Sequence, residues 1–144
     1  MPAQVMGEAN ETRKQKMALE TITTRTCVMQ LKADGIIYHD YFPDTYDTLA
    51  DAQEHLAAIV KLSPDRRRPL LVDIRPMQGI ERQARVYYSG QEYARSVTAV
   101  ALLVGSPVTQ VMANFFIGLN QPPVPTKLFT SEAEAVTWLK GFSE

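Results

Sequence analysis

The chain is poor in cysteine and has no strong charge of either sign. Its 144 residues include a single cysteine, Cys27, which excludes an internal disulfide and a zinc site built from paired cysteines. A lone cysteine also favours a reducing compartment. The formal net charge is −1. Because no overall field attracts nucleic acid or an anionic membrane, we predict no nucleic-acid partner.

Long apolar runs are missing as well. No segment approaches the roughly 18 consecutive apolar residues that a membrane-spanning helix needs. Residues 1–20 are polar, carry charges of both signs and lack the apolar core of a signal peptide. We therefore predict a cytoplasmic protein that does not span a membrane. Residues 1–20 are expected to form a flexible tail and residues 21–144 a single domain.

Within the domain, apolar patterning predicts strands that alternate with helices. Residues 24–32 and 36–41 are typical of two strands joined by a tight turn at Asp34-Gly35. The unbroken apolar run of residues 99–104 indicates a strand buried on both faces. Two further strands are expected at residues 69–74 and 126–129.

Hydroxyl side chains mark the expected starts of three helices, after Thr48, Ser106 and Ser131. A further helix is expected over residues 80–95. The helix over residues 108–119 has the clearest amphipathic pattern, which predicts that one stripe packs against the sheet. That stripe consists of Val108, Val111, Met112, Phe115, Phe116 and Leu119.

The resulting order is β-β-α-β-α-β-α-β-α. A starting hairpin followed by alternating helices and strands predicts an α/β domain with a mixed sheet of about five strands, of which the later ones are parallel.

Four segments resemble the STAS-type fold of bacterial anti-sigma-factor antagonists, and more closely a group of small, largely uncharacterised STAS-like bacterial proteins. They are residues 70–75, 99–107, 114–120 and 125–131. The resemblance implies a regulatory or ligand-binding module without catalysis. It also implies a phosphorylated serine or threonine at the start of the second helix. The matching residues 75–82 contain no hydroxyl group, so we do not expect that switch here.

Two surfaces are candidates for binding. The first, for an unknown protein partner, is formed by Arg75, Gln78, Arg82 and Arg85. These arginines could clasp an anionic group, or they could form a solvated face with ion pairs to neighbouring carboxylates. A regulatory protein–protein interaction is the leading functional hypothesis.

The second candidate surface lies on the helix over residues 108–119. Phe115 and Phe116, with the loop at Pro122-Pro123, could line a small apolar pocket that has Asn114 and Asn120 at its rim. Core packing or a homodimer contact would account for the same residues. The alternative functional hypothesis is therefore a carrier or sensor of a small apolar or lipid ligand.

No constellation typical of catalysis or of a cofactor is present. Cys27 is expected to point into the core beside Met29 and Leu31, where a thiol is inert. Ser106 is expected to cap a helix, and no G-x-S-x-G motif surrounds it. His39 and His55 are expected to be exposed polar residues, since no zinc-binding motif includes them. We therefore predict no enzyme activity, no cofactor and no metal.

Overall fold

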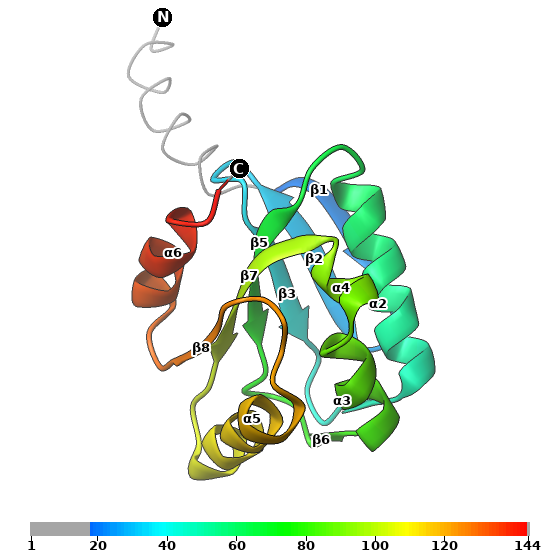
Figure 1. Ribbon diagram of the computed structural model, residues 1–144, viewed down its shortest axis with the longest axis vertical. Coiled ribbons are helices and arrows are strands. Elements are labelled where there is room, and N and C mark those ends of the chain that lie inside the picture. The colour runs from blue at the N-terminus through cyan, green and yellow to red at the C-terminus, as the bar shows by residue number, and fades with distance from the viewer. Residues whose placement is uncertain (1–17, 144) are drawn as a thin grey trace, which may run out of the picture.

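Six strands form one mixed sheet in residues 18–143, the part of the chain that the computed structural model describes (Figure 1). The sheet order is β1-β2-β3-β5-β7-β8. The β1–β2 and β2–β3 pairs are antiparallel, and the other neighbouring pairs are parallel. The predicted α/β class is confirmed, with six strands in place of about five. The strands are β1 (Ala18–Thr23), β2 (Cys27–Lys32), β3 (Ile37–Tyr41), β5 (Arg68–Asp73), β7 (Val97–Leu103) and β8 (Thr126–Phe129).

Helices cover both faces of this sheet. Helix α6 packs on one face, and α2 and α5 pack on the other (Figure 1). Two short strands, β4 (Tyr46–Asp47) and β6 (Gly79–Ile80), pair in parallel as a separate small sheet. The helices are α2 (Leu49–Leu62), α3 (Arg82–Tyr88), α4 (Gln91–Ala94), α5 (Pro107–Asn120) and α6 (Glu132–Lys140).

Strand β7 divides the hydrophobic core into two layers. All of its residues are buried, as the unbroken apolar run predicts. Because side chains alternate along a strand, Val100 and Leu102 pack toward α2 and α5, whereas Ala101 and Leu103 pack toward α6. The predicted turn at Asp34-Gly35 is also present, and Gly35 has φ 83°, a conformation that favours glycine.

Strand β1 begins within residues 1–20, the segment that the sequence predicts to be a flexible tail. Residues 18–20 belong to this strand, whereas residues 1–17 lie outside the described residues. A backbone hydrogen bond of 2.8 Å from Thr24 to Cys27 closes the turn into β2. As an edge strand with exposed Glu20, Thr21 and Thr23, β1 lacks the apolar alternation that would have revealed it.

The expected helix over residues 80–95 is two shorter helices, α3 and α4. Gly90 has an extended backbone conformation (φ −86°, ψ 169°) and separates them. The Ser89 hydroxyl donates to the carbonyl oxygens of Arg85 and Val86 at 3.1 and 2.9 Å, at the end of α3. The break follows from the low helix propensity of glycine and from this side-chain competition for backbone groups.

Helix α5 does not bury the whole stripe predicted for it. Val108, Val111 and Leu119 are 70%, 67% and 66% exposed. The buried face instead carries Thr109 and Ala113, with Met112 and Phe116 half-buried beside them. Residues at these spacings share one side of a helix. The apolar arc is thus wider than the part that contacts the sheet, and its outer edge faces solvent.

The start of α2 is held by reciprocal capping and an ion pair. Thr48 Oγ1 accepts from the backbone of Asp51 at 3.3 Å, and the Asp51 carboxylate accepts from the backbone of Thr48 at 2.9 Å. Arg25 Nε donates to Asp51 Oδ1 at 2.9 Å. Burial alone would raise the pKa of Asp51, but hydrogen bonds from Arg25 and Thr48 outweigh it and lower the pKa to about 2.

We expect Asp51→Asn to lower the free energy of unfolding at neutral pH. The native pKa lies below the ordinary value of 3.8, so the carboxylate stabilises the fold above that pH and ceases to do so as the pH falls toward about 2. Urea unfolding of both proteins across this range measures the difference. A deficit that is equally large near pH 2 would contradict a role for the charge of Asp51.

Candidate functional site

An apolar cavity of about 80 Å³, partly open to solvent, lies between the sheet, α5 and the loop that follows α5. The described residues that line it include no Asp, Glu, Lys or Arg. Helix α5 contributes Ala113 and Phe116, and the following loop contributes Pro122 and Val124. Its polar lining groups are His39, Tyr41, Tyr88, Tyr93 and Thr126.

His39 is a buried polar side chain without a partner. It projects from β3, is 1% exposed, and neither of its ring nitrogens has a hydrogen-bond partner in the described structure. The ring packs against Tyr41 and His55, with centroid distances of 4.5 and 4.6 Å. Burial, with a smaller effect of His55, lowers the pKa of His39 well below its ordinary value, so the ring is neutral.

Beside His39, the buried carboxylate of Asp47 accepts hydrogen bonds from three hydroxyl groups. Oδ2 accepts from Tyr41 at 2.5 Å and from Tyr88 at 2.7 Å, and Oδ1 accepts from Thr26 at 3.1 Å. Asp47 is fully buried, and such donors replace the water that a carboxylate loses in the interior. Burial raises the pKa of both tyrosines well above the ordinary value, so both remain donors.

His55, on α2, extends this network. Its Nδ1 lies 2.7 Å from the Tyr88 hydroxyl. Because Tyr88 donates its proton to Asp47, its oxygen accepts the Nδ1 proton of His55. In the neutral ring Nε2 then accepts. It lies 2.9 Å from Thr26 Oγ1, whose proton is held by Asp47, and 3.4 Å from Thr24 Oγ1, whose proton can be donated to it. Burial lowers the pKa of His55, although Asp47 opposes this shift. We call Asp47, Thr26, Tyr41, Tyr88 and His55 the Asp47 network.

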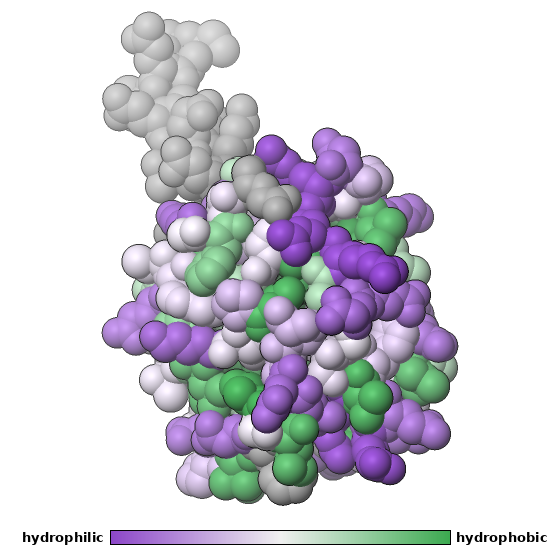
Figure 2. Space-filling model, in the orientation of Figure 1, coloured by the Kyte–Doolittle hydropathy of each residue, from purple (hydrophilic) through white to green (hydrophobic). Residues whose placement is uncertain are grey.

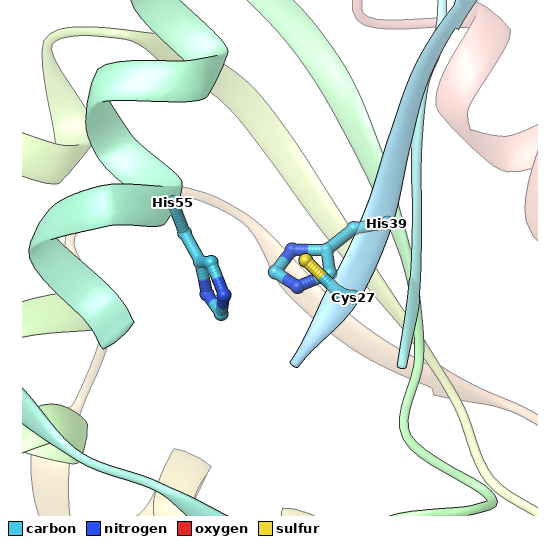
Figure 3. Close-up of side chains that lie close together, drawn as sticks. All are labelled: Cys27, His39 and His55. Carbon is cyan, nitrogen blue, oxygen red and sulfur yellow. The ribbon is translucent and has the colours of Figure 1, made fainter. Parts of the chain in front are cut away.

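Cys27, at the start of β2, lies near both histidines (Figure 3). One ligand atom from each of Cys27, His39 and His55 lies within 4.8 Å of the others. The predicted burial of Cys27 beside Met29 and Leu31 is confirmed. Burial raises the pKa of the Cys27 thiol to about 12, and a hydrogen bond with Thr24 opposes the shift only in part.

The prediction that both histidines are exposed is wrong, because His39 is 1% and His55 0% exposed. A sequence signal for this existed. His39 alternates with Ile37 and Tyr41 along β3, so it shares their inward face. Likewise, His55 falls in the inward stripe of α2, next to Leu56.

The structure places the predicted partner-binding residues at the surface. Arg75, Gln78 and Arg82 are exposed, and Arg85 is half-buried. Arg75 donates from Nε and Nη2 to Asp73 at 2.9 and 2.8 Å. Arg85 donates to a backbone carbonyl, that of Ile80, at 3.0 Å. Within residues 18–143, no hydrogen bond joins these four side chains to one another, so the contact surface remains a prediction.

The residues predicted for an apolar pocket are only partly brought together. Phe116 lines the apolar cavity, as does Pro122. Asn114 is exposed, Asn120 is half-buried, and neither lines it. The side chain of Phe115 lies outside the described part of the structure. Ser106 caps α5 as predicted, since its hydroxyl accepts from the backbone of Thr109 at 3.1 Å.

Comparison with known proteins places this fold in the STAS-like class. The chain resembles the crystal structure of an uncharacterized protein from the DUF3478 family with a SpoIIAA-like fold, from Shewanella loihica PV-4. The TM-score is 0.54 and the identity 14%, over 86% of this chain and 94% of that chain. The STAS-like resemblance drawn from the sequence is therefore confirmed.

The chain belongs to the family described as Domain of unknown function (DUF7793), whose model matches residues 29–143. It is also 34% identical to a protein with unknown function from Arthrobacter sp. FB24, over 82% of this chain and 95% of that chain, with a TM-score of 0.32. Among curated proteins no match was found. No helix in residues 18–143 has the length and apolar character needed to cross a membrane.

We expect Tyr88→Phe to destabilise the fold by about 1–3 kcal/mol, because Asp47 loses a donor and His55 Nδ1 loses its partner. Tyr87→Phe is the matched control, since the Tyr87 hydroxyl has no hydrogen bond within residues 18–143. Chemical denaturation of the two variants measures the contrast. Equal losses in the two variants would mean that the Tyr88 hydroxyl, although part of the Asp47 network, contributes no more to stability than the Tyr87 hydroxyl.

Proposed function

We propose that this chain is a non-catalytic module that binds a small, mainly apolar molecule in the apolar cavity. The observation that carries the proposal is His39, which lines the mainly apolar cavity and whose buried ring nitrogens have no hydrogen-bond partner in the described structure. A buried polar group without a partner costs roughly 1–3 kcal/mol. A ligand with one hydrogen-bonding group opposite His39 would remove that penalty.

The lining of the cavity also restricts the chemistry of the ligand. Because no charged side chain lines it in the described residues, an ionised ligand would lose its hydration without gaining an ion pair. Its volume of about 80 Å³ favours a small molecule, or the end of a larger one that enters from the open side. These features favour a neutral molecule that is apolar over most of its surface, as expected for a carrier or sensor.

The candidate nucleophiles support binding rather than catalysis. Cys27 is buried, and its thiol remains protonated because burial raises its pKa to about 12. The Ser106 hydroxyl is engaged as the cap of α5 and does not line the cavity.

Phenol and toluene form a matched pair of probes, since they differ in the one hydroxyl that could reach His39. We expect phenol to bind roughly tenfold more tightly, the effect of a hydrogen bond worth about 1–1.5 kcal/mol. Titration followed by ¹H–¹⁵N NMR shifts of cavity residues measures both affinities. Native mass spectrometry of the freshly purified protein shows whether a ligand is already bound.

Ala113→Leu should abolish binding of both probes, because Ala113 lines the cavity and leucine adds three carbon atoms there. Ala57→Leu, at an exposed position of α2, is the matched control and should bind as the wild type does. Binding that survives in Ala113→Leu would contradict the cavity as the site. Equal affinity for phenol and toluene would contradict recognition by His39.

A second candidate function is protein recognition, and one observation favours it. Hydrophobic side chains are visible at the surface where α5 lies (Figure 2). The exposed large hydrophobic residues of α5 are Val108, Val111 and Leu119. Exposed apolar patches of this kind mark interaction sites. Helix α5 carries no charged residue, so two copies could pair through it without like-charge repulsion. We propose a homodimer as the form of this interaction.

Sedimentation velocity over a concentration series tests the homodimer. We expect a wild-type dimer that Val111→Glu converts to a monomer, because the charge would be buried without a partner. Val60→Glu places the same charge at a 46% exposed position of α2 and should have no effect. A wild type that stays monomeric throughout would contradict pairing through α5.

A further inference from the structure

Cys27, His39 and His55 converge from three separate elements, β2, β3 and α2 (Figure 3). They are 0%, 1% and 0% exposed, and one ligand atom from each lies within 4.8 Å of the others. Sulfur and imidazole nitrogen are the ligands that zinc and related transition metals prefer. The chain has one cysteine and two histidines in total, and the fold brings all three together.

Apart from contacts with threonine hydroxyls, the three ligand atoms have no hydrogen-bond partner in the described structure. Cys27 Sγ lies 3.2 Å from Thr24 Oγ1, a contact that an ion would replace. Both ring nitrogens of His39 lack a hydrogen-bond partner in the described structure. His55 has its Nδ1 proton held by Tyr88, which in turn donates to Asp47. Nε2 is the remaining ligand atom, and an ion would replace its contacts with the Thr26 and Thr24 hydroxyls at 2.9 and 3.4 Å. A chain of hydrogen bonds from a carboxylate to the far nitrogen is how proteins orient metal-binding histidines.

We propose that Cys27, His39 and His55 bind a zinc-class transition-metal ion. Ligand atoms around tetrahedral zinc lie about 3.3–3.8 Å apart, so an upper separation of 4.8 Å closes with small side-chain movements. His39 also lines the apolar cavity, from which a water molecule can supply the fourth ligand. The proposal shares His39 with the proposed function but does not rest on it, because the cobalt band reports on Cys27 Sγ whereas the phenol titration reports on the cavity.

Two negative groups near the cluster can neutralise the charge of a bound divalent ion. Binding a divalent ion displaces the thiol proton of Cys27 to solvent, and the resulting thiolate neutralises one positive charge. The Asp47 carboxylate, with Oδ2 3.8 Å from His55 Nδ1, offsets the other without binding the ion. A buried ion with compensating charges close by avoids most of the cost of an isolated charge.

Cobalt(II) titration of the full-length chain, without an affinity tag, tests the proposal. We expect a thiolate-to-cobalt charge-transfer band that saturates at one equivalent and is bleached by zinc. Since the chain has one cysteine, such a band reports on Cys27 alone. Zinc should also raise the melting temperature, because an ion that binds the native state stabilises it.

Variants assign the ligands. Cys27→Ser should lose the charge-transfer band, and His39→Ala and His55→Ala should each weaken cobalt binding at least tenfold. Met29→Leu changes a buried residue of the same strand that offers no ligand at this cluster, and should leave the titration unchanged. Circular dichroism of each variant verifies that it folds.

Two results would overturn the proposal. One is a folded wild type that shows neither the charge-transfer band nor a zinc-dependent rise in melting temperature. The other is a band of unchanged affinity in both histidine variants. The first result is measured on the wild type alone, so it decides the matter even where a variant fails to fold. Phenol binding can survive either result, so failure of the metal site and failure of the proposed function are distinguishable.

Discussion

The burial of Asp47 is the constraint on which the rest of the site depends. A carboxylate in the interior is tolerated when donors surround it, and here Thr26, Tyr41 and Tyr88 donate to it. Those donors come from the turn before β2, from β3 and from α3. Tyr88 is in turn hydrogen-bonded to His55 on α2, so the position of His55 also depends on Asp47. One buried charge therefore fixes the relative positions of segments that are distant in the sequence.

The two faces of the sheet differ as a result. Toward α6, the core cluster holds Ile36, Leu71, Leu103, Leu139 and other apolar residues, and needs only close packing. Toward α2 and α5, the core contains the Asp47 network, the apolar cavity and His39, whose ring has no hydrogen-bond partner among the described residues. Interior polar groups are stable only with partners in defined places, so this face has less freedom to be repacked. Both the ligand proposal and the metal proposal lie on it.

Sequence patterning predicts the scaffold well and the site poorly. The apolar run of β7 and the hydroxyl caps of α2 and α5 are local signals, and the structure agrees with them. The convergence of Cys27, His39 and His55 depends on the pairing of β2 with β3 and on the rotation of α2, which no local signal encodes. Residue type favours exposure of His39 and His55, but their positions in the inward patterns of β3 and α2 predict burial. Helix α5 shows the opposite case: Val108, Val111 and Leu119 are apolar and yet exposed.

The central claim is that the Asp47 network orients the two histidines around the cavity and the cysteine. Imidazole ¹⁵N NMR of the metal-free protein at neutral pH tests it directly, because the chain has two histidines to assign. The account predicts that His55 is a neutral Nδ1–H tautomer with a slowly exchanging proton, and that His39 is neutral. An Nε2–H tautomer for His55, or rapid exchange at both rings, would contradict it.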